Sequence, residues 1–224
     1  MTRHGVLLAV AVSLLASGAL ETTARAQAPA PSQRHGRLFP PQDLGLLESP
    51  DRAAWQRPDQ IMDALQVADG ATVADIGAGA GWFTIRLAQR VGPNGIVYAQ
   101  DVQRQMLEAI RRRVSREGLT ERVETRLGSD DDPNLPVGAL DAVLVVDAYQ
   151  EVEGRVLFLQ NLARALKPNG LIGIVNYKPG QGGPGPDENV RVDRASVEAD
   201  ARAANLRIVA AEVLPYQYLL ILAR

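Results

Sequence analysis

A glycine-rich segment is the clearest candidate for a binding site in this chain of 224 residues. It follows a short apolar run and reads Asp75-Ile76-Gly77-Ala78-Gly79-Ala80-Gly81-Trp82. Glycines at a strand-to-helix turn allow the backbone to approach a ligand, and the N-terminus of the following helix offers unpaired N–H groups. The segment therefore predicts a ligand site, and a tight turn that only requires small residues is the alternative.

The spacing of the glycines distinguishes between classes of ligand. A dinucleotide fingerprint, Gly-x-Gly-x-x-Gly, would need a glycine at position 82, where this chain has Trp82. Asp75 ends the preceding buried strand, where a carboxylate is costly without a partner. We expect Asp75 to accept hydrogen bonds from loop amides and to face a ligand ammonium, which suits an amino-acid-bearing nucleoside such as S-adenosylmethionine. The predicted cofactor-binding residues here are Asp75, Gly77, Ala78, Gly79 and Gly81.

Polar residues also follow the next two predicted strands. Asp101 lies across from the glycine-rich segment, where its carboxylate can bind both ribose hydroxyls, and Val102 belongs to the same predicted cofactor site. The alternative for Asp101 is a cap on the helix that follows. Ser129 and Asp130 stand in the acidic loop 128–136, where a polar or acidic residue can bind the adenine amino group. This loop could instead be solvated or hold calcium weakly.

The elements that must position these residues alternate between β-branched runs and longer helical stretches, which is typical of a parallel sheet covered by helices. The predicted strands are Thr72–Ile76, Ile96–Gln100, Val123–Leu127, Ala142–Asp147, Leu171–Asn176, Arg207–Leu214 and Tyr218–Ala223. The predicted helices are Pro58–Leu65, Trp82–Val91, Gln103–Glu117, Arg155–Leu166 and Asp193–Ala204. Only three residues separate the last two strands, so these strands must form an antiparallel hairpin.

With these elements in place, the stretch from Leu38 to the C-terminus resembles the class I S-adenosylmethionine-dependent methyltransferases. Asp75 to Gly81 is similar to the primary cofactor motif of that family, and Asp101 to its ribose-binding position. Lys167-Pro168-Asn169-Gly170-Leu171 resembles its Lys-Pro-Gly-Gly-x-Leu turn. The resemblance implies an α/β fold: a three-layer Rossmann-like sandwich with a mostly parallel seven-stranded sheet and an antiparallel C-terminal hairpin. It also implies S-adenosylmethionine as the methyl donor.

In this architecture the methyl acceptor faces the ends of the fourth and fifth strands. The candidate catalytic residues are Asp147, Tyr149, Glu151 and Tyr177, and Asp147 is also a candidate cofactor ligand. Methyl transfer needs little besides in-line alignment, and Asp147, Glu151 or Tyr177 could supply a base if one is required. The alternative for the tyrosines is packing with exposed hydroxyls.

The regions outside this core lead to expectations about location and access. Residues 1–26 are predicted to be a signal peptide because Arg3, an apolar run and Ala24-Arg25-Ala26 precede Gln27. The protein is then periplasmic or secreted; an uncleaved anchor is the alternative. Residues 27–37 are expected to be a disordered linker, 38–57 an arm anchored by Trp55, and 58–224 the methyltransferase domain. We expect the loop Lys178–Asp187 and the arm to close over the acceptor.

Composition excludes several function classes. The chain has no cysteine, and both histidines, His4 and His35, precede the predicted domain, so Cys–His or Ser–His–Asp catalysis and a typical zinc site are excluded there. With 24 basic and 26 acidic residues, nucleic acid is not an expected partner. We expect no stable membrane span after cleavage, and the sequence predicts no oligomeric state.

The predicted function is S-adenosylmethionine-dependent methyl transfer to a small molecule or an envelope component. The first alternative is a non-catalytic module of the same fold that binds the cofactor. The second is an NAD-dependent oxidoreductase, which Trp82 and the absence of a Tyr-x-x-x-Lys pair oppose.

Overall fold

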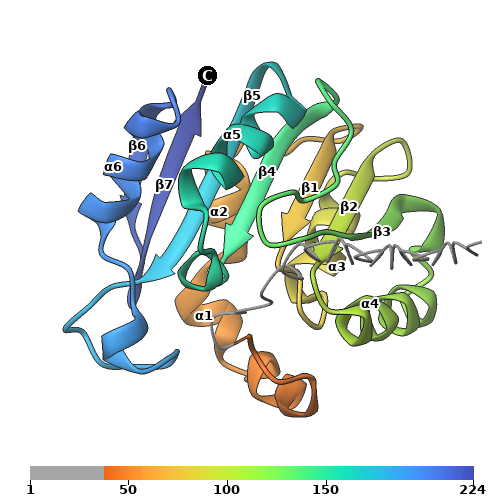
Figure 1. Ribbon diagram of the computed structural model, residues 1–224. Coiled ribbons are helices and arrows are strands. Elements are labelled where there is room, and N and C mark those ends of the chain that lie inside the picture. Colours follow the sequence, from red (N-terminus) through yellow and green to blue (C-terminus); the bar gives the residue numbers. More distant parts are fainter. Residues whose placement is uncertain (1–37) are drawn as a thin grey trace, which may run out of the picture. The chain divides into compact units, whose positions relative to one another are not determined.

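A seven-stranded sheet with the order β3-β2-β1-β4-β5-β7-β6 forms the centre of the structure (Figure 1). The computed structural model describes residues 38–224. The strands are β1 (Thr72–Ile76), β2 (Ile96–Asp101), β3 (Val123–Leu127), β4 (Leu140–Val146), β5 (Leu166–Tyr177), β6 (Arg207–Val213) and β7 (Gln217–Ala223). The strands β1 to β5 pair in parallel, whereas β7 runs antiparallel to both β5 and β6. The predicted α/β fold with a C-terminal hairpin is confirmed.

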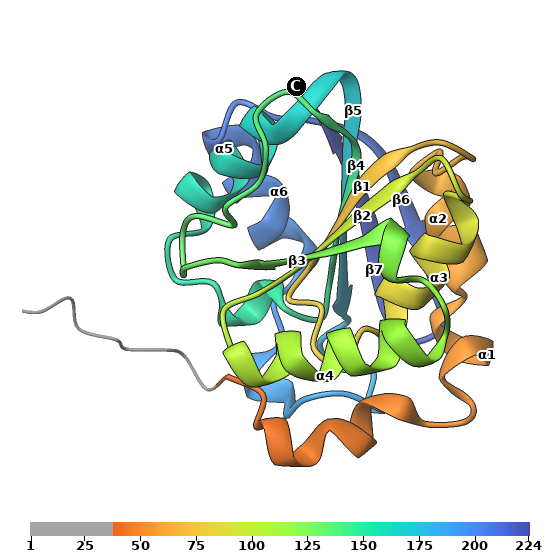
Figure 2. The ribbon, with the colours of Figure 1, turned by 90° about the vertical axis from the view of Figure 1, so that its right-hand side faces the viewer.

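Helices cover both faces of the sheet, as the edge-on view in Figure 2 shows. They are α1 (Arg52–Gln56), α2 (Pro58–Ala64), α3 (Trp82–Arg90), α4 (Arg104–Arg116), α5 (Arg155–Ala165) and α6 (Arg194–Ala203). The described part of the chain also forms four 3-10 helices: η1 (Pro41–Glu48), η2 (Thr120–Arg122), η3 (Tyr149–Glu151) and η4 (Glu188–Val190). Buried side chains of α2, α3 and α4 pack on one face, and those of α5 and α6 pack on the other.

Alternating side chains of the central strands supply both hydrophobic cores. In β4, Leu144 packs in the core beneath α2 to α4, whereas Val143 and Val145 pack in the core beneath α5 and α6. Successive side chains of a strand point to opposite faces, so a strand that is buried on both faces needs a continuous apolar run. This requirement explains the uninterrupted Ala142-Val143-Leu144-Val145-Val146 sequence, and it places the first polar residue, Asp147, just beyond the strand.

The boundary of β5 differs from the prediction. Lys167 to Gly170 was expected to be a turn before the strand, but β5 already begins at Leu166. Leu140 pairs with Leu166, and Ala142 pairs with Leu171, so the residues between 166 and 171 form an irregularity within the strand. Such a bulge accommodates turn-forming residues without ending the ladder.

The arm at residues 38–57 contains η1 and α1, and Gln56 holds it in addition to the predicted anchor, Trp55. Trp55 is only half-buried, although its ring lies 6.0 Å from that of Tyr177 and 6.1 Å from that of Tyr216. Gln56 is the fully buried residue of α1, with 0% of its surface exposed. A polar side chain can be buried in this way only when it is hydrogen-bonded, and Gln56 is.

The predicted signal peptide (residues 1–26) and linker (residues 27–37) lie outside the described residues. Between residues 38 and 224, no helix has the length and apolar character needed to cross a membrane.

Candidate functional site

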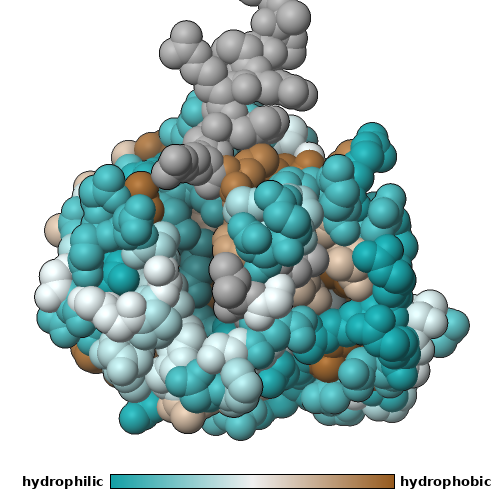
Figure 3. Space-filling model, turned by 90° about the horizontal axis from the view of Figure 1, so that it is seen from below, coloured by the Kyte–Doolittle hydropathy of each residue, from teal (hydrophilic) through white to brown (hydrophobic). Residues whose placement is uncertain are grey.

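The glycine-rich loop lies at the carboxyl edge of the sheet, between β1 and α3. Figure 3 shows this side of the molecule, where the surface is mainly hydrophilic with small apolar patches. Gly77, Gly79 and Gly81 have φ values of 64°, 54° and 77°, which L-residues with side chains rarely adopt. A Cβ at Gly77 would lie 2.5 Å from the Cβ of Ala148, so the loop needs glycine to approach the segment after β4. Gly77 is exposed, and its backbone is therefore accessible to a ligand.

Two side chains at the end of β2 hold this loop. Asp101 Oδ2 accepts a hydrogen bond from the Gly79 N–H at 3.0 Å, and its Oδ1 accepts one from the Gln103 N–H at 2.9 Å. Gln103, and not Asp101, occupies the N-cap position of α4, so the capping alternative for Asp101 is wrong. A carboxylate has about four acceptor sites, and Asp101 therefore keeps capacity for ribose hydroxyls.

Gln100 is the second of these side chains, and sequence reasoning missed it. Its Oε1 accepts a hydrogen bond from the Gly77 N–H at 3.3 Å, and the side chain is buried. The available signal was an amide at an inward-facing position of an otherwise apolar strand.

Asp75 has a different partner from the one expected. Its Oδ2 accepts a hydrogen bond from the Thr84 hydroxyl at 2.6 Å, whereas the Gly77 and Gly79 N–H groups donate to Gln100 and Asp101. The expectation that Asp75 binds loop amides is therefore wrong. Burial raises the pKa of Asp75 to about 6, and the Thr84 hydroxyl and the Arg52 charge act in the opposite direction. A cationic ligand nearby would favour the ionised form.

Asp147 lies just after β4, next to the end of β1. Its backbone has a φ of 56°, and the residue is half-buried. Its Oδ1 accepts a hydrogen bond from Gln217 Nε2 at 2.7 Å, and its Oδ2 accepts one from Gln56 Nε2 at 3.1 Å. Burial raises the pKa of Asp147 to about 6, against the attraction of Arg52. The arm and the C-terminal hairpin thus meet at this carboxylate.

Arg52 brings a cation from the arm to this edge of the sheet. Its guanidinium carbon lies 4.4 Å from the centre of the Trp82 ring, a cation–π distance. Burial lowers the pKa of Arg52, while the negative charges of Asp147 and Asp75 raise it. Arg52 was not predicted, because no spacing in the sequence relates residue 52 to the glycine-rich segment.

Glu151 is hydrogen-bonded to the backbone of Phe39 in the arm. The Glu151 carboxylate accepts a hydrogen bond from the Phe39 N–H, and burial, with a contribution from Asp101, raises the pKa of Glu151 to about 7. The Phe39 carbonyl accepts a hydrogen bond from Gln103 Nε2 at 3.0 Å. The arm therefore crosses from the start of α4 to η3.

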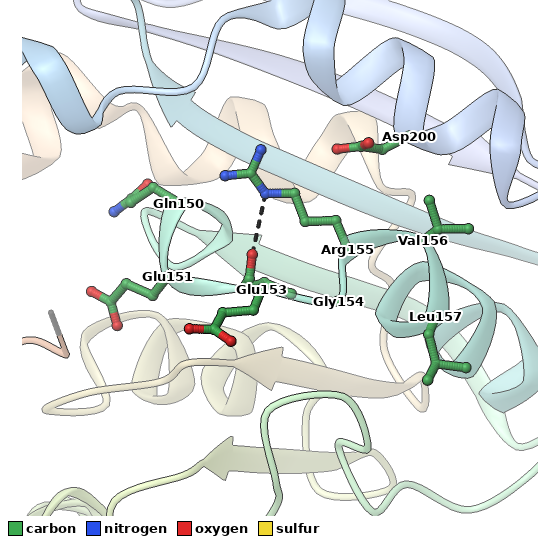
Figure 4. A pocket seen from close by; sticks show the side chains of 9 residues that line it. Gln150, Glu151, Glu153, Gly154, Arg155, Val156, Leu157 and Asp200 are labelled. Atoms are coloured by element: carbon green, nitrogen blue, oxygen red, sulfur yellow. Dashed lines mark hydrogen bonds between the residues drawn. The ribbon is translucent and has the colours of Figure 1, made fainter. Parts of the chain in front are cut away.

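Glu151 also borders a pocket of about 700 Å³ between η3, α5 and α6. Figure 4 shows Glu151 at one end of this pocket and Leu157 at the other, with Asp200 contributed by α6. The Arg155 side chain is fixed in the pocket by a hydrogen bond from its Nε to the Val152 carbonyl at 3.2 Å. The pocket is lined by apolar side chains and by more acidic than basic ones.

The two candidate tyrosines differ in position. Tyr149 is 0% exposed, packs against Phe158 and donates a hydrogen bond to Asp200 Oδ2 at 2.9 Å. The prediction that Tyr149 contacts the acceptor is therefore wrong, because the following α5 and α6 enclose it. Tyr177 is buried next to Trp55, and burial together with the charge of Asp147 raises its pKa.

Val102 and the acidic loop flank Asp101. Val102 is half-buried, and Ser129 and Asp130 are exposed. The Ser129 hydroxyl accepts a hydrogen bond from the Asp132 N–H at 3.2 Å, so this loop closes partly on itself. Within residues 38–224, no three His, Cys, Asp or Glu side chains are grouped to hold a metal ion. The adenine contact of Ser129 or Asp130 stays a prediction.

Comparisons with known proteins agree with this geometry. Residues 73–170 match the family model of a methyltransferase domain. Nocamycin O-methyltransferase of Saccharothrix syringae is 30% identical over 120 residues, which are 54% of this chain and 42% of that protein. Demethylmenaquinone methyltransferase of Lactobacillus johnsonii is 30% identical over 123 residues, 54% of this chain and 49% of that protein. The chain thus spans less than half of the length of these relatives.

A solved structure extends the likeness to the whole sheet. The S-adenosylmethionine-dependent methyltransferase from Aquifex aeolicus has a TM-score of 0.78 and 27% identity, and the match covers 82% of this chain and 98% of that one. The seven-stranded sheet with its antiparallel hairpin is therefore the Rossmann-like fold of S-adenosylmethionine-dependent methyltransferases. Residues 73–170 of this chain are thus similar in sequence to a methyltransferase domain.

Proposed function

We propose that this protein transfers a methyl group from S-adenosylmethionine to a small molecule or an envelope component. The observation that carries the proposal is the placement, at one edge of the sheet, of the Gly77–Gly81 loop between Asp101 and Asp147. Asp101 lies on the side expected for the ribose. Asp147 lies where Gln56 of the arm and Gln217 of the C-terminal hairpin meet. The cofactor, when bound, supplies a methyl group already activated on a sulfonium.

The described residues fit the charged groups of this cofactor. Asp101 offers acceptor sites for ribose hydroxyls, and the exposed Gly77 backbone can approach the ligand. Arg52 offers a cation to the carboxylate of the methionine part. Burial raises the pKa values of Asp75 and Asp147 to about 6. The positive charges of the cofactor would favour the ionised form of both carboxyl groups.

If the acceptor must lose a proton, a group that titrates near neutral pH would accept that proton. Asp147 and Glu151 have pKa values raised to about 6 and about 7, so either can accept a proton under physiological conditions. The names of the two relatives, a nocamycin O-methyltransferase and a demethylmenaquinone methyltransferase, refer to unlike acceptors. We therefore propose no particular acceptor.

The test is a search for labelled products. Purified protein that begins at residue 27 is incubated with S-adenosylmethionine carrying a tritiated methyl group and with periplasmic or cytoplasmic extract. We expect label in an extract component, and loss of that label with the Asp147→Asn variant. Calorimetric binding of S-adenosylhomocysteine without any labelled product would contradict the proposal and favour the non-catalytic binding module.

A further inference from the structure

Arg191 organises the Gly/Pro-rich loop that follows β5. Its side chain is only 3% exposed. Its Nε donates to the Pro186 carbonyl at 3.0 Å, and its Nη1 donates to the carbonyls of Lys178 at 3.1 Å and Gly182 at 3.0 Å. Its Nη2 donates to the Pro184 carbonyl at 3.4 Å. One guanidinium thus holds four backbone carbonyls of a single loop, which its planar fork of five donors permits.

Glu188 complements Arg191 on the same loop. The Glu188 carboxylate accepts hydrogen bonds from the N–H groups of Gly180 at 2.6 Å and Gly182 at 2.9 Å, and it pairs with Arg191 at 3.0 Å. The loop has few apolar side chains, so polar contacts replace the hydrophobic packing that usually fixes a segment. Arg191 and Glu188 therefore hold a loop that has little apolar surface of its own.

The other side of the loop rests on aromatic rings of the site. A Cβ at Gly185, where φ is 107°, would lie 2.6 Å from the Tyr177 ring, and a Cβ at Gly183 would lie 2.5 Å from the Tyr216 ring. The Arg191 guanidinium carbon also lies 5.3 Å from the centre of the Tyr177 ring. Only glycine allows the loop to lie this close to both tyrosines.

We infer that Arg191 is a positioning residue for methyl transfer, acting through Tyr177 and the loop 178–190. This inference rests on the proposed function. The Arg191 guanidinium and Gly185 of the loop lie next to the Tyr177 ring, the centre of the Trp55 ring lies 6.0 Å from its centre, and the charge of Asp147 acts on its hydroxyl. Holding the Tyr177 ring in place fixes the position of this side chain next to Asp147. Without the guanidinium, four loop carbonyls lose their hydrogen-bond donor, and the loop no longer holds the Tyr177 ring.

The test compares Arg191→Met and Arg191→Lys with Arg202→Met as the matched control. Arg202 lies on α6, is exposed and donates a hydrogen bond to the Glu198 carboxylate at 3.0 Å. The measurements are the midpoint of thermal unfolding, the affinity for S-adenosylhomocysteine, and the rate of label transfer from tritiated S-adenosylmethionine to the small-molecule fraction of an extract. That fraction is used over a range of dilutions to separate the plateau rate from the half-saturating amount.

We expect both Arg191 variants to lower the plateau rate at least about tenfold, with S-adenosylhomocysteine affinity within about twofold of wild type. Lysine keeps the charge but lacks the fork, so Arg191→Lys should not rescue the rate. A wild-type rate in either variant would overturn the inference. Equal losses of cofactor affinity and thermal stability would also overturn it, because they indicate a merely structural role.

A second pair of variants keeps the test decisive if Arg191→Met fails to fold. Gly185→Ala and Gly180→Ala both place a side chain at a positive φ, 107° and 74°, but only the first pushes on Tyr177, since nothing lies within 4 Å of a Cβ at Gly180. We expect Gly185→Ala alone to lower the plateau rate. Equal rates would overturn the inference, whereas a wild type that transfers no label contradicts the proposed function itself.

Discussion

Four carboxyl groups at the carboxyl edge of the sheet share a physical feature. Burial raises the pKa of Asp75, Asp101, Asp147 and Glu151, which means that the folded chain alone does not fully compensate their charges. A buried carboxylate whose charge the protein does not compensate can be compensated by a bound ligand. Groups with perturbed pKa values accordingly cluster at functional sites. A cofactor with a sulfonium, an ammonium and two ribose hydroxyls would supply both the charge and the donors.

At Asp101, removal of the carboxylate should weaken cofactor binding without unfolding the chain. We expect Asp101→Ala to reduce S-adenosylhomocysteine affinity by about 1.5–3 kcal/mol, the range for hydrogen bonds to a charged group. Calorimetry measures the loss. Glu124→Ala, an exposed carboxylate on the neighbouring β3, is the control and should change nothing. Equal affinities for the two variants would mean that Asp101 only supports the loop.

The pH dependence of Asp75 and Asp147 has a defined sign. Both carboxyl groups have a pKa of about 6 in the folded chain, above the ordinary value of 3.8. Between these values the folded state binds more protons than the unfolded state, so the free energy of unfolding of the ligand-free protein falls as pH rises from about 4 to about 6. The loss approaches about 3 kcal/mol for each group.

Cofactor binding should show the opposite trend, because the cationic ligand favours ionised carboxylates. We expect S-adenosylmethionine affinity to rise between pH 5 and 7, by up to about tenfold for each group whose proton is lost. Asp147→Asn should make both pH profiles shallower. Asp141→Asn, at the other end of β4, is the control. A flat binding profile for the wild type would show that neither carboxylate responds to the ligand.

At the scale of elements, local patterns predicted the sheet well. A short β-branched run marked β1 and a continuous apolar run marked β4, and the three residues between the last two strands required a hairpin. The glycine spacing placed the loop and Asp101 together, because parallel strands end at the same edge.

The contacts that the sequence could not predict are those between distant segments. Gln56 and Gln217 meet at Asp147 although 161 positions separate the two glutamines, and no local periodicity encodes such a pairing. Tyr149 was misassigned because its distance from the strand end says nothing about the direction of its side chain. Arg191 was missed because an arginine after a Gly/Pro-rich loop resembles any surface charge until its four carbonyl partners are placed.

The α1 anchor allows a test of how the arm is held. Gln56 Nε2 donates to both Asp147 Oδ2 and Gln217 Oε1, each at 3.1 Å. We expect Gln56→Ala to lower the free energy of unfolding by about 1–3 kcal/mol, because it leaves buried polar groups without a partner. Urea unfolding measures the change. Gln89→Ala, exposed on α3, should stay within about 0.5 kcal/mol of wild type. A loss as small as that of the control would show that the arm is held elsewhere.

At the scale of the whole molecule, the location of the protein decides which cofactor supply and which acceptors it meets. The predicted signal peptide carries Arg3, Arg25 and Glu21, so its removal would leave 22 basic and 25 acidic residues from the original 24 and 26. A modest negative charge of this kind gives no electrostatic attraction to anionic surfaces. An envelope acceptor would then have to be recognised at the site rather than concentrated by charge.

We expect the exported chain to begin at or near Gln27. The uncharged run Val6–Leu20 is too short for the roughly 20 residues that span a bilayer as a helix, and Ala24-Arg25-Ala26 has the small residues that signal peptidase requires. Mass spectrometry of the periplasmic fraction should therefore find a protein about 26 residues shorter than the translated chain. Replacing Ala24 and Ala26 with leucine should block processing, whereas Ala28→Leu, just beyond the site, should not. Intact wild-type protein that starts at Met1 in the inner membrane would instead identify an anchor, and it would tether the methyltransferase domain to the membrane.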